Sequence, residues 1–377
     1  MSWKEMDNMS LRAEFIAFAQ QAGSNIRELC WRYQISSRTA YKWLLRYEQE
    51  GLEGLADRSR RPKHSPRQTC AEMEAKVVEL RAETGWGGRK LAGLLRDQGY
   101  HGVPHANTIT DILRRAGKLE AEECAKHEPW QRFERHLPNE LWQMDFKGHF
   151  ATLNGRCHPL TVLDDHSRFC VGLKACTDET EPTVHGHLQA IFRQYGLPRA
   201  ILCDNGGPWG GGYPELELSK LAVWLIRLGV HPQHGRPAHP QTQGKDERFH
   251  RTLNTELLQG RSFSNPLDCQ SHFDAWRDRY NLVRPHEALQ LDTPAQHYQL
   301  SQRIYPETLP PIEYNTAEIV RKVQATGEVT YHDREYRVGK GLVGQYVVLR
   351  PTDTDGVFDV FFCSYKVRQI HVSRCLP

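Results

Sequence analysis

Three features are absent or scarce in this sequence. None of its ten cysteines forms a CxxC pair, which argues against a zinc knuckle or ribbon, whose ligands come in close pairs. No apolar run approaches the roughly 18 residues that span a bilayer, and the N-terminus lacks a basic region followed by an apolar stretch. We therefore expect a cytoplasmic protein with reduced thiols, no secretory signal and no membrane partner.

The net charge is small, at +3, but the charge is unevenly distributed. Residues 25–67 contain ten Lys or Arg against five Asp or Glu, a local excess of five positive charges. A basic N-terminal region is the usual electrostatic footprint of a nucleic-acid binder. At about 100–200 residues per domain, the length of 377 residues predicts two to four domains.

Residues 1–56 are predicted to form a helix-turn-helix domain. Apolar residues recur at helical spacing before and after residues 34–36, and Ser36 or Ser37 is a suitable N-cap for the second helix. The exposed face would present residue types suited to phosphates and base edges: Arg38, Thr39, Lys42 and Arg46. The alternative is a plain helical hairpin with a solvated basic face.

Residues 57–68 are predicted to be an extended basic linker, because they are rich in Arg and Pro and poor in apolar residues. Such an arm suits a DNA minor groove, with Arg58, Arg60, Arg61 and Lys63 as the contacts, although a merely soluble linker has the same composition. Residues 69–120 return to helical periodicity and predict a second helix-turn-helix domain, with Arg114 and Arg115 as DNA-facing candidates.

From residue 129 the pattern changes to that of a mixed α/β domain, which we place at residues 129–291. A strand is predicted over residues 142–150, two more over 160–163 and 169–173, and then helices alternate with strands at 200–203 and 230–233. Residues 292–317 contain several prolines and predict a linker. Residues 318–377 alternate apolar and polar positions between turn signals, which predicts a small all-β barrel of about five strands.

Three carboxylates occupy unusual positions. Asp145 lies inside a predicted strand, where Asp is disfavoured, and Asp204 ends the strand over residues 200–203. Glu247 lies in a predicted helix over residues 241–260. Converging carboxylates suit hard divalent cations such as Mg²⁺ or Mn²⁺, and two such ions support an in-line attack at phosphorus. The alternatives are a turn aspartate at Asp204 and a solvated helix charge at Glu247, whose helical angle lies away from the apolar stripe.

These residues resemble the insertion-sequence DDE transposases, which have an integrase catalytic core and are related to retroviral integrases. The resemblance covers nearly the whole chain and rests on these segments: Trp142-Gln143-Met144-Asp145, Leu163-Asp164-Asp165-His166-Ser167-Arg168, Cys203-Asp204-Asn205-Gly206, the run from Arg236 to Leu253, and Tyr280-Asn281 with Arg284-Pro285-His286. The resemblance implies an RNase H-like core in which Asp145, Asp204 and Glu247 bind the metal. Asp246 is adjacent, but the Gln243-Gly244-x-x-Glu247 pattern favours Glu247.

The resemblance also implies a reaction and partners. Water would cleave DNA at the terminal inverted repeats, and the freed 3′-hydroxyls would attack target DNA without a covalent protein intermediate. We expect a homodimer or higher oligomer on double-stranded DNA, and association with a prokaryotic nucleoid. Further DNA contacts are implied on and before the catalytic helix, at Gln241, Gln243, Lys245, Arg248 and Arg251, although a solvated charged face would look the same. Asp165 is expected to be structural and to pair with Arg168.

Two other functions fit part of the pattern. A sequence-specific DNA-binding regulator with an inactive core would share the basic helices but would not need all three acids. A nuclease on the RNase H-like fold would cut DNA without joining it. The two helix-turn-helix domains and the trailing β domain favour a transposase that binds specific DNA ends.

Overall fold

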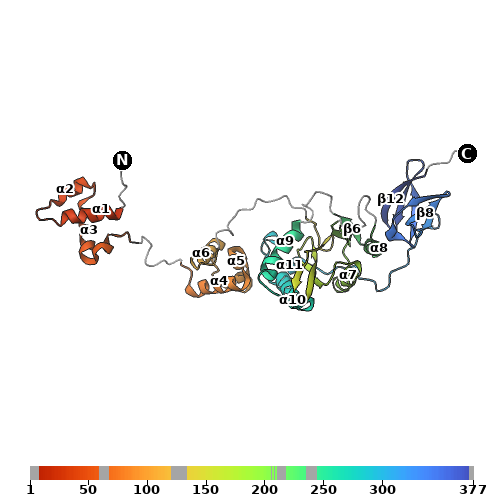
Figure 1. Ribbon diagram of the computed structural model, residues 1–377, viewed down its shortest axis with the longest axis horizontal. Helices are drawn as coiled ribbons and strands as arrows, with labels where there is room; N and C mark the ends of the chain where they lie inside the picture. The colour runs from red at the N-terminus through yellow and green to blue at the C-terminus, as the bar shows by residue number, and fades with distance from the viewer. Residues whose placement is uncertain are drawn as a thin grey trace. The chain divides into compact units, whose positions relative to one another are not determined.

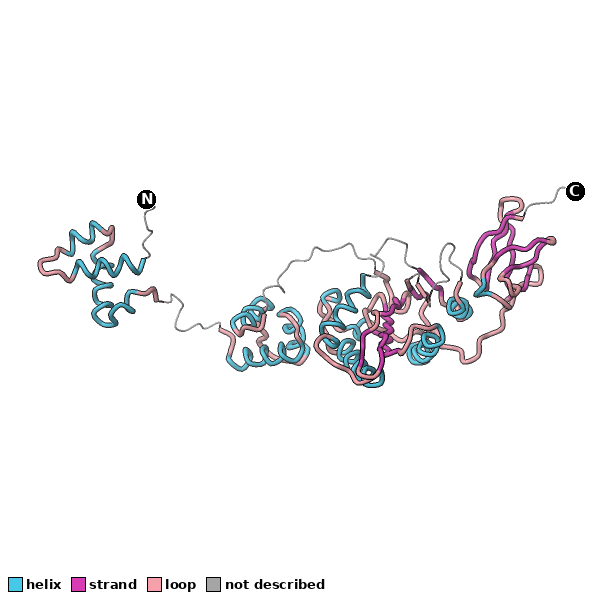
Figure 2. Tube along the Cα trace, viewed as in Figure 1, coloured by secondary structure: helices cyan, strands magenta, loops and turns pink. Residues whose placement is uncertain are grey.

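The computed structural model describes residues 8–58, 68–119, 134–204, 206–207, 209, 218–234 and 244–372. The chain divides into two compact units, Met1–Gln68 and Thr69–Pro377. Figure 1 gives the order of the elements along the chain, and Figure 2 shows helices without strands in the described residues up to 119. The linker candidates Arg60, Arg61 and Lys63 lie outside the described residues.

The first unit is a small helical domain that contains the expected helix-turn-helix. It consists of α1 (Asn8–Ala19), α2 (Ile26–Arg32), α3 (Ser37–Glu50) and the 3-10 turn η1 (Gly51–Leu55). Ser36 caps α3 by accepting a hydrogen bond from Thr39 N, and it is one of the two caps that the sequence predicts. Gln34 turns the chain between α2 and α3 with a φ of 50°. Phe15, Ile16 and Trp43 are buried at the centre of the domain.

A second helical domain opens the other unit. It is built from α4 (Ala71–Thr84), α5 (Gly88–Asp97) and α6 (Ala106–Arg115), which bury the apolar side chains of all three helices in one cluster. The start of α5 requires glycine, because a Cβ on Gly88 would lie 2.4 Å from Ala106 O and from Thr110 Oγ1. This close approach lets α5 and α6 pack, and it gives the three-helix arrangement predicted for residues 69–120.

The central domain is built on a mixed sheet. Its strands are β1 (Trp142–Phe146), β2 (Phe150–Thr152), β3 (Gly155–Asp164), β4 (Cys170–Cys176), β5 (Ala200–Cys203) and β6 (His231–His234). The order is β2-β3-β1-β5-β6, and β4 pairs with β3. β1 runs antiparallel to β3 and parallel to β5. The strand predicted over residues 142–150 is therefore two strands, because the chain turns at Gly148, whose φ is 85°.

Helices cover both faces of this sheet. On one face, α7 (Glu181–Tyr195) and α8 (Lys220–Arg227) pack on Trp142 and Met144. On the other face, α9 (Gly244–Leu253), the π-helical turn η4 (Asn254–Leu258) and α10 (Pro266–Leu282) pack on Leu163 and Leu173. Because successive strand side chains alternate between faces, Asp145 faces the α9 side of the sheet.

Part of the segment that we expected to be a linker lies against this domain. After η5 (Glu287–Leu289) and α11 (Pro294–His297), the Tyr298 ring stacks on Phe169 with ring centroids 4.3 Å apart, and Tyr305 is buried. The Arg303 guanidinium donates to the main-chain oxygens of Leu228 and Gly229. Aromatic burial therefore holds this part of the predicted proline-containing linker against the central domain, although the segment after α11 forms no helix or strand up to β7.

The C-terminal domain has the expected strands but is not a barrel. β7 (Ile319–Lys322), β10 (Tyr346–Pro351), β11 (Val357–Phe362) and β12 (Tyr365–His371) form one antiparallel sheet, and β8 (Glu328–Tyr331) and β9 (Arg334–Arg337) form a separate hairpin. A short helix, η6 (Lys340–Leu342), follows β9. Within the described residues, no strand ladder joins β7 to β12 or either of them to the hairpin. Alternation predicts strands and their buried faces, but closure depends on edge pairing, which alternation does not specify.

Candidate active site

Asp145 and Asp204 stand at the ends of neighbouring strands. β1 and β5 are parallel, with Trp142 opposite Ile201 and Gln143 opposite Leu202. Continuing this register by two residues brings Asp145 opposite Asp204, on strands about 4.8 Å apart. Asp145 follows Met144 and Asp204 follows Cys203, and both Met144 and Cys203 pack on the α7 face, so alternation places the two aspartates together on the opposite face of the sheet. The structure therefore brings these two predicted site residues together.

The environment of the pair disfavours two negative charges. Burial, with the charge of Asp204 as the next cause, raises the pKa of Asp145 to about 6. Burial also raises the pKa of Asp204, against the lowering effects of a hydrogen bond from Gly206 N and of His234. Glu179, in the loop before α7, raises the pKa of both carboxyls.

The third predicted carboxylate lies on α9, but a neighbour takes the buried position. Asp246 is 1% exposed, whereas Glu247 is exposed to solvent. Burial raises the pKa of Asp246 well above its usual range, and the charge of Asp145 adds to this effect. Neither carboxyl oxygen of Asp246 has a hydrogen-bond partner among the described residues. The structure thus places α9 beside the aspartate pair, with Asp246 turned inward and Glu247 outward.

These residues fit a hard divalent cation by their chemistry. Within the described part of the chain, no three His, Cys, Asp or Glu side chains are gathered closely enough to hold one ion. However, Asp145 and Asp204 offer oxygen ligands whose mutual repulsion a cation would relieve, and Mg²⁺ commonly takes only one or two protein carboxylates. The buried carboxyl of Asp246, whose oxygens have no hydrogen-bond partner among the described residues, lies close enough to Asp145 for the charge of Asp145 to raise its pKa.

The turn between β3 and β4 holds the first turn of α9. Asp165 is fully buried and accepts hydrogen bonds from Arg135 N and Gln143 Nε2, and it forms an ion pair of 2.6 Å with Lys245 Nζ. The expected pairing of Asp165 with Arg168 is wrong. The Arg168 guanidinium instead donates to the main-chain oxygen of Asp165 and forms an ion pair with Glu134. Lys245, a predicted phosphate contact, is engaged with Asp165 and its side chain is 16% exposed.

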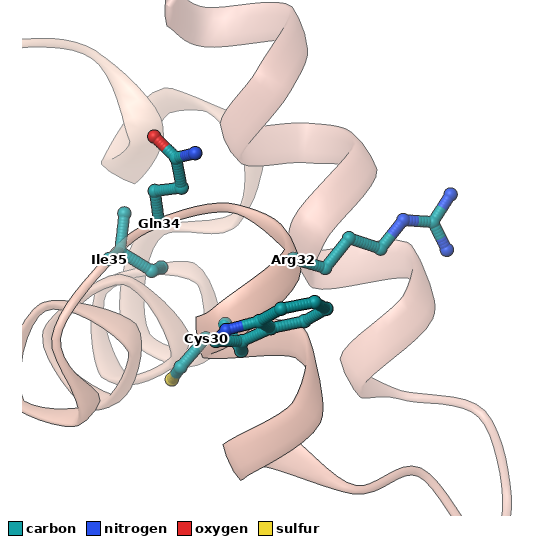
Figure 3. Close-up of a pocket in the computed structure, with 5 residues that line it drawn as sticks. Cys30, Arg32, Gln34 and Ile35 are labelled. Carbon is teal, nitrogen blue, oxygen red and sulfur yellow. The ribbon is translucent and has the colours of Figure 1, made fainter.

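The predicted DNA-binding face of α3 is only partly presented to solvent. Arg38 and Lys42 are exposed, whereas the Thr39 hydroxyl is 2.9 Å from Ser36 Oγ, in the cap. The Arg46 guanidinium lies 5.0 Å from the centroid of the Trp43 ring and is half-buried there. A pocket of about 570 Å³ beside α2 includes Cys30, Arg32 and Gln34 (Figure 3). Its lining residues include one thiol, Cys30, but no carboxylate or histidine, so it offers no set of oxygen ligands for a hard divalent cation.

The other predicted DNA contacts differ in their surroundings. Three of them form ion pairs on the surface of their own unit: Arg58 with Glu50, Arg114 with Asp111, and Arg115 with Glu74. Arg248 and Arg251 are exposed on α9. Gln241 and Gln243 lie outside the described residues. The structure leaves the DNA roles of all these side chains as predictions.

Sequence reasoning missed two groups that the structure places at the site. Glu179 acts on both aspartates, yet it follows β4 in an acidic stretch that looks like any helix start. His250 lies within hydrogen-bond distance of Thr161, the residue opposite Asp145 in β3. A spacing of three residues from Glu247 is the only sequence signal for His250, because it places both residues on adjoining turns of one helix.

Comparisons with known proteins agree with this architecture. The chain matches the integrase core domain family over residues 135–240 and again over 228–294. It matches a helix-turn-helix domain over residues 11–63, a homeodomain-like domain over 39–113, and the C-terminal domain of IS481 family transposases over 318–374. A mixed sheet with an integrase core, preceded by DNA-binding helices, defines a polynucleotidyl transferase that acts on DNA.

Individual relatives are consistent with these matches. The chain is 27% identical over 251 residues to the insertion element IS476 39.2 kDa protein of Xanthomonas euvesicatoria, covering 65% of this chain and 70% of that protein. It is 25% identical over 377 residues to the transposase for transposon Tn552 of Staphylococcus aureus, covering 85% and 74%. A simian T-cell lymphotropic virus intasome structure aligns over 78% of this chain and 95% of that chain, with 16% identity and a TM-score of 0.39.

The chain is thus similar to the insertion-sequence transposases of the retroviral-integrase superfamily, with an integrase core domain and a C-terminal domain of the IS481 family type. These matches support a DNA transposase that carries helix-turn-helix domains. No helix in the described ranges has the length and apolar character needed to cross a membrane.

Proposed function

We propose that this transposase binds the terminal inverted repeats of an insertion sequence and catalyses metal-dependent DNA cleavage and strand transfer. The observation that carries the proposal is the placement of Asp145 and Asp204 abreast on two parallel strands of an integrase core, where burial raises the pKa of each. Residues 1–56 and 69–120 are assigned as the DNA-binding domains and residues 129–291 as the catalytic core.

Asp145, Asp204 and Glu247 are the residues that would hold two Mg²⁺ or Mn²⁺ ions. When bound, such ions activate water or a 3′-hydroxyl and stabilise the leaving oxygen at phosphorus. The two aspartates must both be ionised to act as ligands, and the elevated pKa of Asp145 makes it the group that gives up a proton on binding. Glu247 follows Asp246 on α9, so it belongs to the helix that packs beside the pair.

Exposed cations of this protein would bind the phosphates of the DNA partner. Arg38 and Lys42 are the exposed cations of α3, and Arg248 and Arg251 are exposed on the catalytic helix. The first pair would contact the element end, and the second pair would hold phosphates near the reacting strand. Because two ends are joined in concert, the working form is a homodimer or higher oligomer on double-stranded DNA, and it would reside on the nucleoid.

A joining assay tests the proposal. Purified protein is mixed with a labelled DNA end from its own element and a plasmid target, with Mg²⁺, Mn²⁺ or a chelator. We expect cleavage and joining by the wild type with either metal, and a loss of both by at least about 100-fold in Asp145→Asn, Asp204→Asn and Glu247→Gln. Asp178→Asn is the matched control, because Asp178 is a half-buried acid next to Glu179 in the chain, and its carboxylate accepts hydrogen bonds from Thr180.

The same assay separates the alternative functions. Specific binding of the end without any cleavage indicates a DNA-binding regulator with an inactive core. Cleavage without joining indicates a nuclease. Either outcome would refute strand transfer, and retained activity in Asp145→Asn would refute the assignment of the metal ligands.

A further inference from the structure

The helix that carries Glu247 is connected to the strand that carries Asp145 by a relay of two hydrogen bonds. Thr161 lies opposite Asp145 in the register of β1 and β3, and its hydroxyl donates to the main-chain oxygen of Asp145 at 3.0 Å. His250 Nε2, on α9, lies 2.8 Å from the same hydroxyl oxygen. A hydroxyl has only one proton to donate, so His250 Nε2 carries a proton and donates to Thr161.

The relay is buried and its members are neutral. Thr161 is fully buried. Burial, with a contribution from the charge of Lys147, lowers the pKa of His250 to about 4, so the imidazole is uncharged near neutral pH. A neutral imidazole has one donor and one acceptor nitrogen, which is the form that the relay requires. Hydrogen bonds in such a largely buried setting are directional and costly to break.

The relay complements the other contacts that hold α9. Lys245, in the first turn of the helix, pairs with Asp165, and Phe249 and Leu253 pack in the apolar cluster under the sheet. Apolar contacts hold the helix against the sheet, but they are non-directional. They therefore fix the position and rotation of the helix less strictly than directional hydrogen bonds do. The ion pair at Lys245 and the relay at His250 lie on either side of Glu247 along α9, and both anchor the helix to the sheet strands and their turn.

We propose that His250 and Thr161 are positioning residues that set the placement of α9 relative to Asp145 and thereby the affinity of the site for a divalent cation. The inference rests on the proposed function, because it takes Asp145 and Glu247 as ligands. Neither residue supplies a ligand atom. Residues that orient metal ligands by hydrogen bonds, without binding the metal themselves, typically contribute 10- to 100-fold in metal affinity.

The test measures Mn²⁺ binding to the full chain without DNA, by the electron paramagnetic resonance signal of the free ion. Thr161→Val removes the hydroxyl and keeps the shape, whereas Thr161→Ser keeps the hydroxyl. Thr252→Val is the matched control, because the Thr252 hydroxyl on the same helix donates only to Arg248 O of that helix. We expect the dissociation constant to rise about tenfold in Thr161→Val and to change less than about twofold in the other two.

A second pair of variants covers the case in which Thr161→Val does not fold, as judged by its thermal transition. His250→Gln retains a donor near the position of Nε2, and His250→Phe retains a ring without a donor. We expect weak Mn²⁺ binding in His250→Phe and substantial recovery in His250→Gln. Wild-type affinity in the variants that lack the relay overturns the inference, and so does an equal loss in Thr161→Ser and Thr161→Val.

Asp145→Asn distinguishes failure of the inference from failure of the proposed function. If the wild type binds Mn²⁺ and Asp145→Asn does not, the metal site stands and the Thr161 and His250 variants decide the inference alone. If Asp145→Asn binds Mn²⁺ as tightly as the wild type, the metal site is elsewhere, and the inference falls with it.

Discussion

Two buried aspartates, Asp246 and Asp165, provide a sharp test of how the core is built. They are 1% and 0% exposed, but Asp165 accepts bonds from Arg135 N, Gln143 Nε2 and Lys245 Nζ, whereas the oxygens of Asp246 have no partner among the described residues. The same substitution should therefore have opposite effects. We predict that Asp246→Val stabilises the protein and that Asp165→Val destabilises it.

The magnitudes follow from the partners that each side chain has. An unsatisfied buried polar group costs about 1–3 kcal/mol, and Asp246 also contributes about 0.3–1 kcal/mol of favourable interaction with the N-terminus of α9. The net gain expected for Asp246→Val is about 1–2 kcal/mol. Removing Asp165 leaves the Lys245 ammonium without its carboxylate in a largely buried place, and breaking such a pair costs about 3–5 kcal/mol.

Calorimetric melting in a chelator, at pH 7.5 and pH 4, measures both effects. For a domain of this size, each kcal/mol corresponds to a shift of about 2–4 °C in the core transition. The pKa of Asp246 is higher in the folded than in the unfolded protein, so its destabilising effect on the fold grows as the pH rises above about 4. The stability gained in Asp246→Val should therefore be smaller at pH 4 than at pH 7.5. A loss of stability in Asp246→Val comparable to that in Asp165→Val would refute the reasoning, because it would mean that Asp246 is well partnered.

Three further predictions concern metal binding, the core and DNA. The pKa of Asp145 is raised to about 6 and only its ionised form binds metal, so Mn²⁺ affinity should be level above pH 6 and fall about tenfold per pH unit below it. An Mn²⁺ affinity that stays constant from pH 7.5 to pH 5 in calorimetric titration would contradict this. Glu256 accepts hydrogen bonds from Arg284 Nε and Trp276 Nε1, so Glu256→Gln should lower the free energy of unfolding by about 3–5 kcal/mol in urea melts. A change below about 1 kcal/mol would contradict the pairing. Arg38→Ala should weaken binding of the element end and reduce the slope of log affinity against log salt by about 1 in fluorescence anisotropy, and an unchanged slope would remove Arg38 from the contact face.

Much of this fold follows from local patterns. Ser36 is a good N-cap followed by an apolar helical face, so α3 is predictable from a dozen residues. The strand at residues 200–203 and the helices that flank it follow from buried runs and periodicity. The end of the strand over residues 142–150 is less predictable, because Gly148 turns the chain inside a run that is otherwise typical of one strand.

The candidate site is only partly predictable. Asp145 is noticeable because an acid is rare inside a strand, and Asp204 because it ends one. The rotation of α9 is different, since it depends on Phe249 and Leu253 packing under the sheet, and it turns Asp246 rather than Glu247 inward. The ion pair of Lys245 with Asp165 joins residues 80 positions apart, and no local pattern indicates it.

Strand transfer with a pre-cleaved DNA end is the most direct test of the central claim that this core joins DNA by metal-dependent attack of a 3′-hydroxyl. One labelled end carries a terminal 3′-hydroxyl and its control carries a 3′-deoxy terminus, and each is incubated with protein, plasmid and Mg²⁺. The account predicts a plasmid-joined product with the 3′-hydroxyl end alone, and none in Asp145→Asn. A joined product from the 3′-deoxy end, or a covalent protein–DNA adduct, would contradict it.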